Sequence, residues 1–185
     1  MSDSIHVLGF AGSLRQKSFN RAALHAAHEL LPPDMTLEIF DLAPIPLFNE
    51  DVQAQGAPEA VAHFKERIAA ANALLIATPE YNYSMPGVLK NALDWASHPI
   101  NTTPLNGKPL AIMGVSQGPW GTARAQLHMR HSCVYFNTYP LNKPIVQIPH
   151  AAAKFDADLR LTDEPTRQQI RALLEALSVW AGKLK

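Results

Sequence analysis

Short apolar runs and longer helical patterns alternate along this chain. Four apolar runs are too short for helices and are typical of buried strands, and a fifth short segment, residues 36–40, alternates between polar and apolar residues as a strand does. Each is followed, before the next run, by a segment in which apolar residues recur at the three- and four-residue spacing of a helix. The predicted strands cover residues 5–10, 36–40, 73–77, 109–115 and 145–148.

The helical segments have recognisable ends. Pro32 and Pro33 stop the first helix, and Asp163 can cap the last one, with Pro165 in its first turn. Residues 41–58 include APIPLFNED and are predicted to be irregular because prolines recur in them. The predicted helices cover residues 19–31, 59–71, 87–97, 122–131 with a possible continuation to 135, and a final segment after Asp163.

This order of elements predicts an α/β fold with a parallel sheet. No repeat, linker or low-complexity tract divides residues 1–185, so a single domain is expected. For a doubly wound five-stranded parallel sheet, the common strand order is 2-1-3-4-5. In that order the carboxyl ends of the first, third and fourth strands face one crevice, and their loops are where a site is expected.

Composition and charge narrow the range of functions that the protein could have. Hydrophobic residues make up 47% of the chain and charged residues 17%, as in an ordinary globular protein. Lys plus Arg equals Asp plus Glu at 16 each, so neither a nucleic-acid surface nor a strongly acidic redox-docking surface is expected. A lone cysteine, Cys133, excludes an internal disulfide. With no apparent signal peptide or membrane span, a cytoplasmic location is predicted.

The loop after the first strand, GSLRQKSFNR at residues 12–21, has the chemistry of a phosphate site. It opens a helix, whose first N–H groups attract anions, and it adds the hydroxyls of Ser13 and Ser18, the guanidinium of Arg15 and the amide of Asn20. It matches neither GxGxxG nor a Walker loop, and it holds no cysteine nucleophile. A terminal phosphate monoester therefore fits best, and the alternative is a capped helix with a solvated Arg15.

Two further loops supply aromatic and glycine residues. TPEYNYSMPG at residues 78–87 is stiffened by proline and carries Tyr81 and Tyr83, which suits a flat heteroaromatic ligand, although either tyrosine could instead pack on the next helix. SQGPWGTARAQ at residues 116–126 could let a backbone approach a ligand at Gly118, with Trp120 as a wall, or could be a plain glycine turn. A phosphate at one end and a flat ring at the other indicate flavin mononucleotide (FMN), in preference to FAD or riboflavin.

Together, GSLRQKSFNR, PEYNYSMPGVLKNALDW and SQGPWGTARAQ resemble the flavodoxin-like NADPH-dependent FMN reductases, and most of all the bacterial quinone and chromate reductases. LAPIPLFNED matches the segment that follows their second strand. Thr122 departs from the family, in which many members carry glycine. The FMN-binding residues that the resemblance implies are Ser13, Arg15, Ser18, Phe19, Asn20, Pro79, Glu80, Tyr81, Asn82, Tyr83, Ser116 and Gly118.

The resemblance implies an oxidoreductase that takes hydride from NAD(P)H and passes two electrons by a ping-pong mechanism to quinones, with chromate, azo compounds and free flavin as further acceptors. The flavin carries the chemistry, so no catalytic side chain is expected. A homodimer or homotetramer is also implied. The alternatives are an FMN-binding electron carrier without NAD(P)H activity and a ligand sensor without turnover.

The segment HMRHSC contains three potential metal ligands, His128, His131 and Cys133. On a helix the two histidines share a face, but Cys133 does not align with them. No further carboxylate or cysteine completes a tetrahedral set, so no metal site is predicted. Cys133 is instead expected to be a small buried hydrophobic residue.

Overall fold

The sheet has the predicted winding. The computed structural model describes residues 4–184, and all of its strand pairs are parallel. The order β2-β1-β3-β4-β5, with β6 also paired to β4, confirms the expected order 2-1-3-4-5. The strands are β1 (Ile5–Ala11), β2 (Met35–Phe40), β3 (Ala73–Ala77), β4 (Pro109–Val115), β5 (Tyr139–Pro140) and β6 (Val146–Ile148).

The fifth position of the sheet is divided between two short strands. β5 pairs with the start of β4 through Pro109↔Tyr139, and β6 pairs with its end through Met113↔Val146. Between them lies Pro144, which has no N–H to donate to a neighbouring strand. The predicted run 145–148 is therefore β6 with one extra residue, and the two-residue β5 was missed because it is too short to show a pattern.

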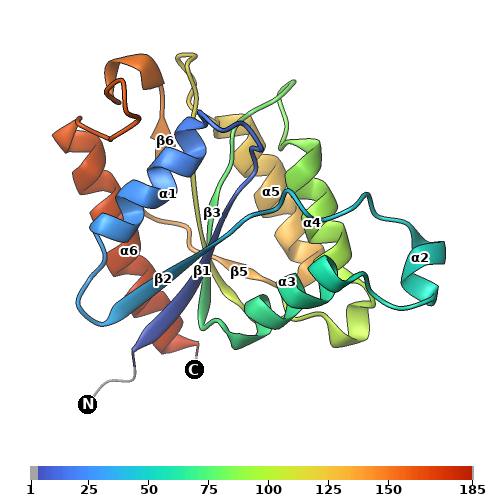
Figure 1. Ribbon diagram of the computed structural model, residues 1–185. Coiled ribbons are helices and arrows are strands. Elements are labelled where there is room, and N and C mark those ends of the chain that lie inside the picture. The colour runs from blue at the N-terminus through green and yellow to red at the C-terminus, as the bar shows by residue number, and fades with distance from the viewer. Residues whose placement is uncertain (1–3, 185) are drawn as a thin grey trace.

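Helices cover both faces of the sheet (Figure 1). α1 (Phe19–Glu29) and α6 (Glu164–Lys183) share one hydrophobic core with the sheet, and α3 (Glu59–Ala70), α4 (Gly87–Ser97) and α5 (Ala123–Phe136) share the other. Alternate strand residues enter opposite cores: Val7 and Leu75 lie on the α1 side, and Leu8 and Leu74 on the other. Every one of these four side chains is fully buried.

The ends of the helices differ in detail from the prediction. α1 stops at Glu29, ahead of the proline pair, and α5 continues beyond His131 to Phe136. Asp163 caps α6 as expected, because its side chain accepts the N–H of Thr166 at 3.0 Å. The segment predicted to be irregular contains one short helix, α2 (Glu50–Ala54), which buries no residue and so gave no apolar pattern. Two single turns of 3-10 helix, η1 (Ile100–Thr102) and η2 (Ala151–Ala153), complete the chain.

The proline-rich segment after β2 is fastened to α4. The carbonyl oxygen of Pro46 accepts hydrogen bonds from Asn91 Nδ2 and Trp95 Nε1, both at 2.8 Å. The N–H of Phe48 donates to Asn91 Oδ1 at 2.7 Å, and its ring meets Trp95 edge-on at 4.9 Å. Trp95 is 1% exposed, so this indole is a packing residue that also holds the loop.

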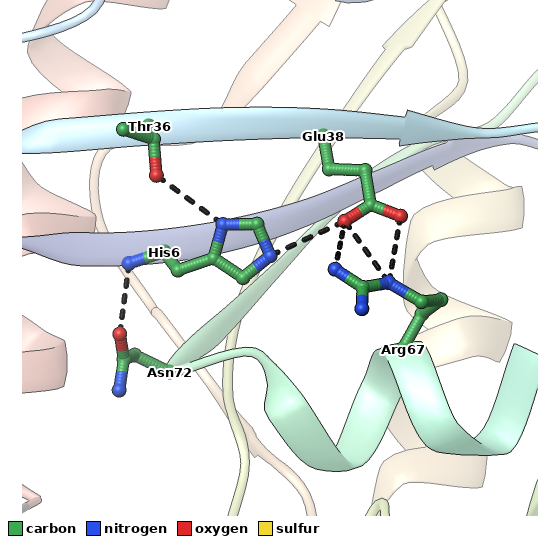
Figure 2. A network of polar contacts seen from close by, with 5 residues as sticks. All are labelled: His6, Thr36, Glu38, Arg67 and Asn72. Atoms are coloured by element: carbon green, nitrogen blue, oxygen red, sulfur yellow. Dashed lines mark hydrogen bonds and ion pairs between the residues drawn. The ribbon is translucent and has the colours of Figure 1, made fainter.

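A polar network ties β1, β2 and α3 together on the α3 side of the sheet (Figure 2). The Glu38 carboxylate accepts from Arg67 Nε at 2.9 Å and faces His6 Nε2 at 3.3 Å. His6 Nδ1 lies 3.2 Å from Thr36 Oγ1, and the His6 N–H donates to Asn72 Oδ1 at 2.8 Å. The Arg67 guanidinium keeps the pKa of Glu38 below its ordinary value, with a smaller contribution from His6. His6 is at the start of β1, so the network is remote from the carboxyl ends of the strands.

Candidate functional site

The three predicted loops meet in one cleft at the carboxyl ends of β1, β3 and β4. The cleft measures about 190 Å³, and its lining includes every candidate residue except Asn82 and Tyr83. Those two line an adjoining hollow of about 330 Å³, which shares Glu80, Ser116 and Gly118 with the cleft. Parallel strands deliver their following loops to the same edge, so the winding of the sheet is what assembles these residues.

One end of the cleft is rich in free backbone donors. Within residues 4–184, no hydrogen bond is formed by the backbone N–H groups of four residues that line this end, Ser13, Arg15, Phe19 and Asn20. Ser18 caps α1 by accepting the N–H of Arg21 at 3.4 Å, which leaves its hydroxyl hydrogen free to donate into the cleft. Ser13 is also nearly buried, whereas Arg15 is exposed and has no ion-pair partner in the described part of the chain. This end has donors and positive charge but no carboxylate, which fits a phosphate.

Asn20 has a structural task as well. Its Nδ2 donates to the carbonyl of Val115 at 3.0 Å, and its Oδ1 accepts the N–H of the same residue at 2.9 Å. These two bonds join the start of α1 to the end of β4 and account for the burial of the amide. One Nδ2 hydrogen remains for a ligand.

The other end of the cleft is formed by a tight turn after β3. Tyr81 and Ser84 exchange backbone hydrogen bonds of 3.0 and 2.9 Å. The two residues between them are left-handed, with φ of 49° at Asn82 and 66° at Tyr83. A tyrosine rarely adopts this conformation, so the turn must be held by its surroundings. Tyr83 is 67% exposed, and its ring is in contact with Arg124, which lies on α5 and not on the helix that follows the turn.

The turn is held by Glu80 and two residues of α5. The Glu80 carboxylate accepts the N–H groups of Arg124 and Ala125 at 2.9 and 3.2 Å and so caps α5, while its Oε1 accepts from Arg124 Nε at 2.5 Å. The Arg124 guanidinium lies 3.8 Å from the centre of the Tyr83 ring, a cation–π contact. One helical turn further on, His128 Nδ1 lies 2.9 Å from Ser84 Oγ.

Arg124 and His128 were not predicted as site residues. Their four-residue spacing on a helix was the available signal, because it puts both side chains on the face that meets the turn. Glu80 was predicted to hold a ligand, and its bonds give it an additional part in fixing the cleft wall to α5.

Thr122, the departure from the family pattern, faces the sheet. Its side chain is fully buried, and its Oγ1 accepts from Gln126 Nε2 at 3.1 Å. It lies so close to Gly114 of β4 that a side chain at that glycine would collide with it. The hydroxyl therefore leaves the cleft wall unchanged, and the neighbouring Trp120, 69% exposed, lines the adjoining hollow instead.

His128 and Cys133 of the HMRHSC segment lie in different surroundings. Cys133 is buried in the core beneath α5, and this burial raises the pKa of its thiol to about 11, which opposes formation of the thiolate. His128 faces Ser84, as described above. In residues 4–184 there is no group of three or more His, Cys, Asp or Glu side chains arranged to hold a metal ion. The described helices also include none that is long and apolar enough to span a membrane.

Known proteins share this sequence and fold. A family model described as NADPH-dependent FMN reductase matches residues 5–153. The chain is 55% identical to the NAD(P)H-dependent FMN reductase of Pseudomonas aeruginosa, over 100% of both chains. It is 43% identical to a 2-hydroxy-1,4-benzoquinone reductase of a Burkholderia species, over 91% of this chain and 92% of the relative. The solved flavoenzyme NAD(P)H:(acceptor) oxidoreductase of Paracoccus denitrificans has a TM-score of 0.88 at 34% identity, with 97% and 98% of the two chains covered.

The matched segment begins at β1 and ends at η2, so it contains all three loops of the cleft. The predicted resemblance is thereby confirmed, and the donor-rich end of the cleft suits the phosphate of FMN. The protein is an oxidoreductase that uses FMN and NAD(P)H, and the chain belongs to the NADPH-dependent FMN reductase family.

Proposed function

We propose that this protein binds FMN in the cleft and uses NAD(P)H to reduce quinones by two electrons in a ping-pong cycle. The observation that carries the proposal is the group of backbone N–H donors at Ser13, Arg15, Phe19 and Asn20, which have no acceptor among residues 4–184, next to a stiff aromatic turn. Bound FMN supplies the hydride acceptor and donor that no side chain of the cleft provides.

The residues of the cleft divide into two groups in this proposal. At the α1 end, the hydroxyls of Ser13 and Ser18 and the guanidinium of Arg15 hold the phosphate, while Phe19 and Asn20 border the ribityl chain. At the other end, a ring is held by backbone groups and side chains of two loops. These residues are Pro79, Glu80, Tyr81, Asn82, Tyr83, Ser116 and Gly118.

The hollow beside Trp120 and Tyr83 supports the ping-pong order. Both rings are more than half exposed and border the same opening, so a nicotinamide and then a quinone can stack in one place. Because the two substrates share this space, the first must leave before the second enters. Quinones are the preferred acceptor class, since relatives of this chain are named quinone reductases. Chromate, azo compounds and free flavin are secondary candidates for the same opening.

We also propose a cytoplasmic location, from the absence of an apparent signal peptide, and a homodimer or homotetramer of single domains, from the family resemblance. An electron carrier with the same fold is the competing function. Carriers of the flavodoxin type are usually strongly acidic, whereas this chain has 16 acidic and 16 basic residues.

The test is an anaerobic titration of FMN-loaded protein. Addition of NADPH is expected to bleach the visible absorption of the flavin, and a subsequent equivalent of benzoquinone is expected to restore it. Dithionite serves as the control, because it reduces the flavin whether or not NADPH can. Bleaching by dithionite but not by NADPH or NADH would identify a carrier instead of a reductase.

A further inference from the structure

We infer that Trp120 sets the quinone preference of this enzyme by stacking on the second ring of fused-ring quinones such as 1,4-naphthoquinone. The inference rests on the proposed function, in which a quinone is reduced in the hollow that Tyr83 and Trp120 line. Trp120 acts here on the choice of acceptor, and it supplies neither a proton nor an electron.

Trp120 belongs to the outer part of the hollow. The inner part is shared with the cleft proposed for FMN through Glu80, Ser116 and Gly118, whereas Trp120 lines only the hollow, which measures about 330 Å³. A quinone ring that takes up hydride must lie at the inner part, close to the flavin ring. A second, fused ring then extends away from the flavin, toward the part of the hollow that Trp120 lines.

The Trp120 indole is free to meet a ligand, unlike the other two tryptophans of the chain. Trp95 and Trp180 each donate their Nε1–H to a backbone carbonyl, at 2.8 and 2.9 Å. In the described part of the chain, the Trp120 indole donates no hydrogen bond and belongs to neither hydrophobic core. A lone exposed aromatic residue is ordinary, but one that lines a hollow together with a second exposed ring suits a flat ligand.

Tyr83 offers less free surface than Trp120. The Arg124 guanidinium covers one face of the Tyr83 ring, at 3.8 Å from the ring centre, so only the other face is open to a ligand. Indole is also the larger and more electron-rich of the two ring systems. The ring of a quinone is electron-poor, so it gains most by stacking on Trp120.

The charged side chains that line the hollow are bonded to each other. Arg124 Nε donates to Glu80 Oε1 at 2.5 Å, and Arg124 Nη2 lies equally close to the same oxygen. Because this pair leaves no excess charge at the opening, contact with aromatic rings is the main attraction that the hollow offers to an acceptor. Chromate, a small dianion without a ring, gains nothing from such contact.

The backbone on both sides of Trp120 is fixed. Before it, the Gly118 N–H donates to Ser116 Oγ at 3.0 Å, and the Gly118 carbonyl accepts the His150 N–H at 3.3 Å. After it, Gly121 has φ of 58° and lies so close to β6 that a side chain at this position would press on the β6 backbone. A fixed backbone lowers the cost of ordering on binding, because only the side-chain torsions of Trp120 have to settle.

The test is a stopped-flow measurement on FMN-loaded protein whose flavin has been reduced by light in the absence of air. The reduced protein is mixed with 1,4-benzoquinone or 1,4-naphthoquinone, and the return of the flavin absorption gives a second-order rate constant for each. In Trp120→Ala the rate constant for naphthoquinone is expected to fall about 3- to 10-fold more than that for benzoquinone, the range for loss of one aromatic stacking contact. Trp120→Phe keeps a ring and should lose less.

The ratio of the two rate constants is the quantity compared between proteins, because the intrinsic reactivity of each quinone cancels in that comparison. Trp180→Ala is the matched control, since it removes an indole of α6 that lines neither the cleft nor the hollow, and it should leave the ratio unchanged. An unchanged ratio in Trp120→Ala would overturn the inference. If that variant instead changes the oligomeric state in size-exclusion chromatography and keeps the ratio, the indole packs against a second copy of the chain and the inference is equally wrong.

Failure of the inference and failure of the proposed function give different results. If neither quinone restores the flavin absorption of the native protein, quinone reduction itself is refuted, and the inference with it. If both quinones restore it and the ratio does not depend on Trp120, the proposed function stands and only the role of Trp120 is refuted.

Discussion

Replacement of Glu80 by alanine tests whether the cleft in which we propose FMN binds is held in shape by α5. The Glu80 side chain is 7% exposed, and its carboxylate makes bonds to two backbone N–H groups and to the Arg124 side chain. The alanine variant loses all of them at once. It also frees Arg124 from the position in which it covers the ring of Tyr83, whose backbone is left-handed.

The expected loss of stability follows from these contacts. Loss of a helix cap costs about 1 kcal/mol, with a range of about 0.5–2 kcal/mol. The ion pair adds about 0.5–1 kcal/mol, a discounted figure because the Arg124 side chain is 37% exposed. The sum is roughly 1–3 kcal/mol, which lowers Tm by about 2–12 °C for a chain of this size. Glu80→Gln keeps an acceptor for the helix N–H groups and should lose about half as much.

The assay is urea denaturation without added flavin, combined with the dissociation constant for FMN measured by fluorescence quenching. Glu66→Ala is the control, since Glu66 is a carboxylate on α3 whose side chain is 73% exposed. We expect Glu80→Ala to weaken both folding and FMN binding, and the control to change neither. Equal stability of the two alanine variants would refute the view that Glu80 holds the cleft wall.

Three other outcomes are expected. Arg15→Ala should weaken the binding of FMN by about 1.5–3 kcal/mol and that of riboflavin much less, because only FMN carries the phosphate that a charge-assisted bond would hold. An unchanged dissociation constant for FMN would show that the Arg15 side chain is solvated and does not contact the phosphate. Cys133→Ser should keep its turnover per bound flavin, and the native thiol should resist iodoacetamide at pH 8 because its pKa is raised to about 11; rapid alkylation of the folded protein would contradict this. Glu38→Gln should be less stable than the native chain at pH 7. Because the folded pKa of Glu38 lies below its ordinary value of 4.5, this difference is present above that value and should disappear as the pH falls through the folded pKa; a difference that persists at pH 2 in urea titrations would be inconsistent with it.

Sequence reasoning located the cleft because its residues follow strands. Ser13, Tyr81 and Ser116 are far apart in the chain, yet each comes directly after a buried apolar run. Parallel winding brings such positions to one edge without any knowledge of side-chain contacts. The phosphate end of the cleft could be predicted for a second reason, because a helix cap and a helix N-terminus are local features of the sequence.

The contacts that fix the cleft were beyond prediction because they join distant residues. Asn20 and Val115 are 95 positions apart, and Glu80 and Arg124 are 44 apart. No periodicity links such pairs, and each residue has an ordinary local explanation. The turn at Asn82 and Tyr83 was missed for a related reason. Asparagine often adopts a left-handed backbone, but tyrosine rarely does so unless its surroundings require it.

The divided fifth strand indicates where this enzyme can be extended. β5 and β6 are each aligned with β4 by their own pairs, and Leu141 is also fastened to β4 because its N–H donates to the Leu110 carbonyl at 2.7 Å. Residues 142–145 connect the two strands at an edge of the sheet. A peptide inserted after Lys143 would lengthen the connection without sliding either segment along β4, and surface connections tolerate such growth at small entropic cost. β6 leads directly to the strand-end position beside Ser116, whose N–H donates to the Ile148 carbonyl at 2.9 Å. Residues 142–145 are thus a natural place to graft a recognition peptide or a second module while the candidate cleft keeps its geometry.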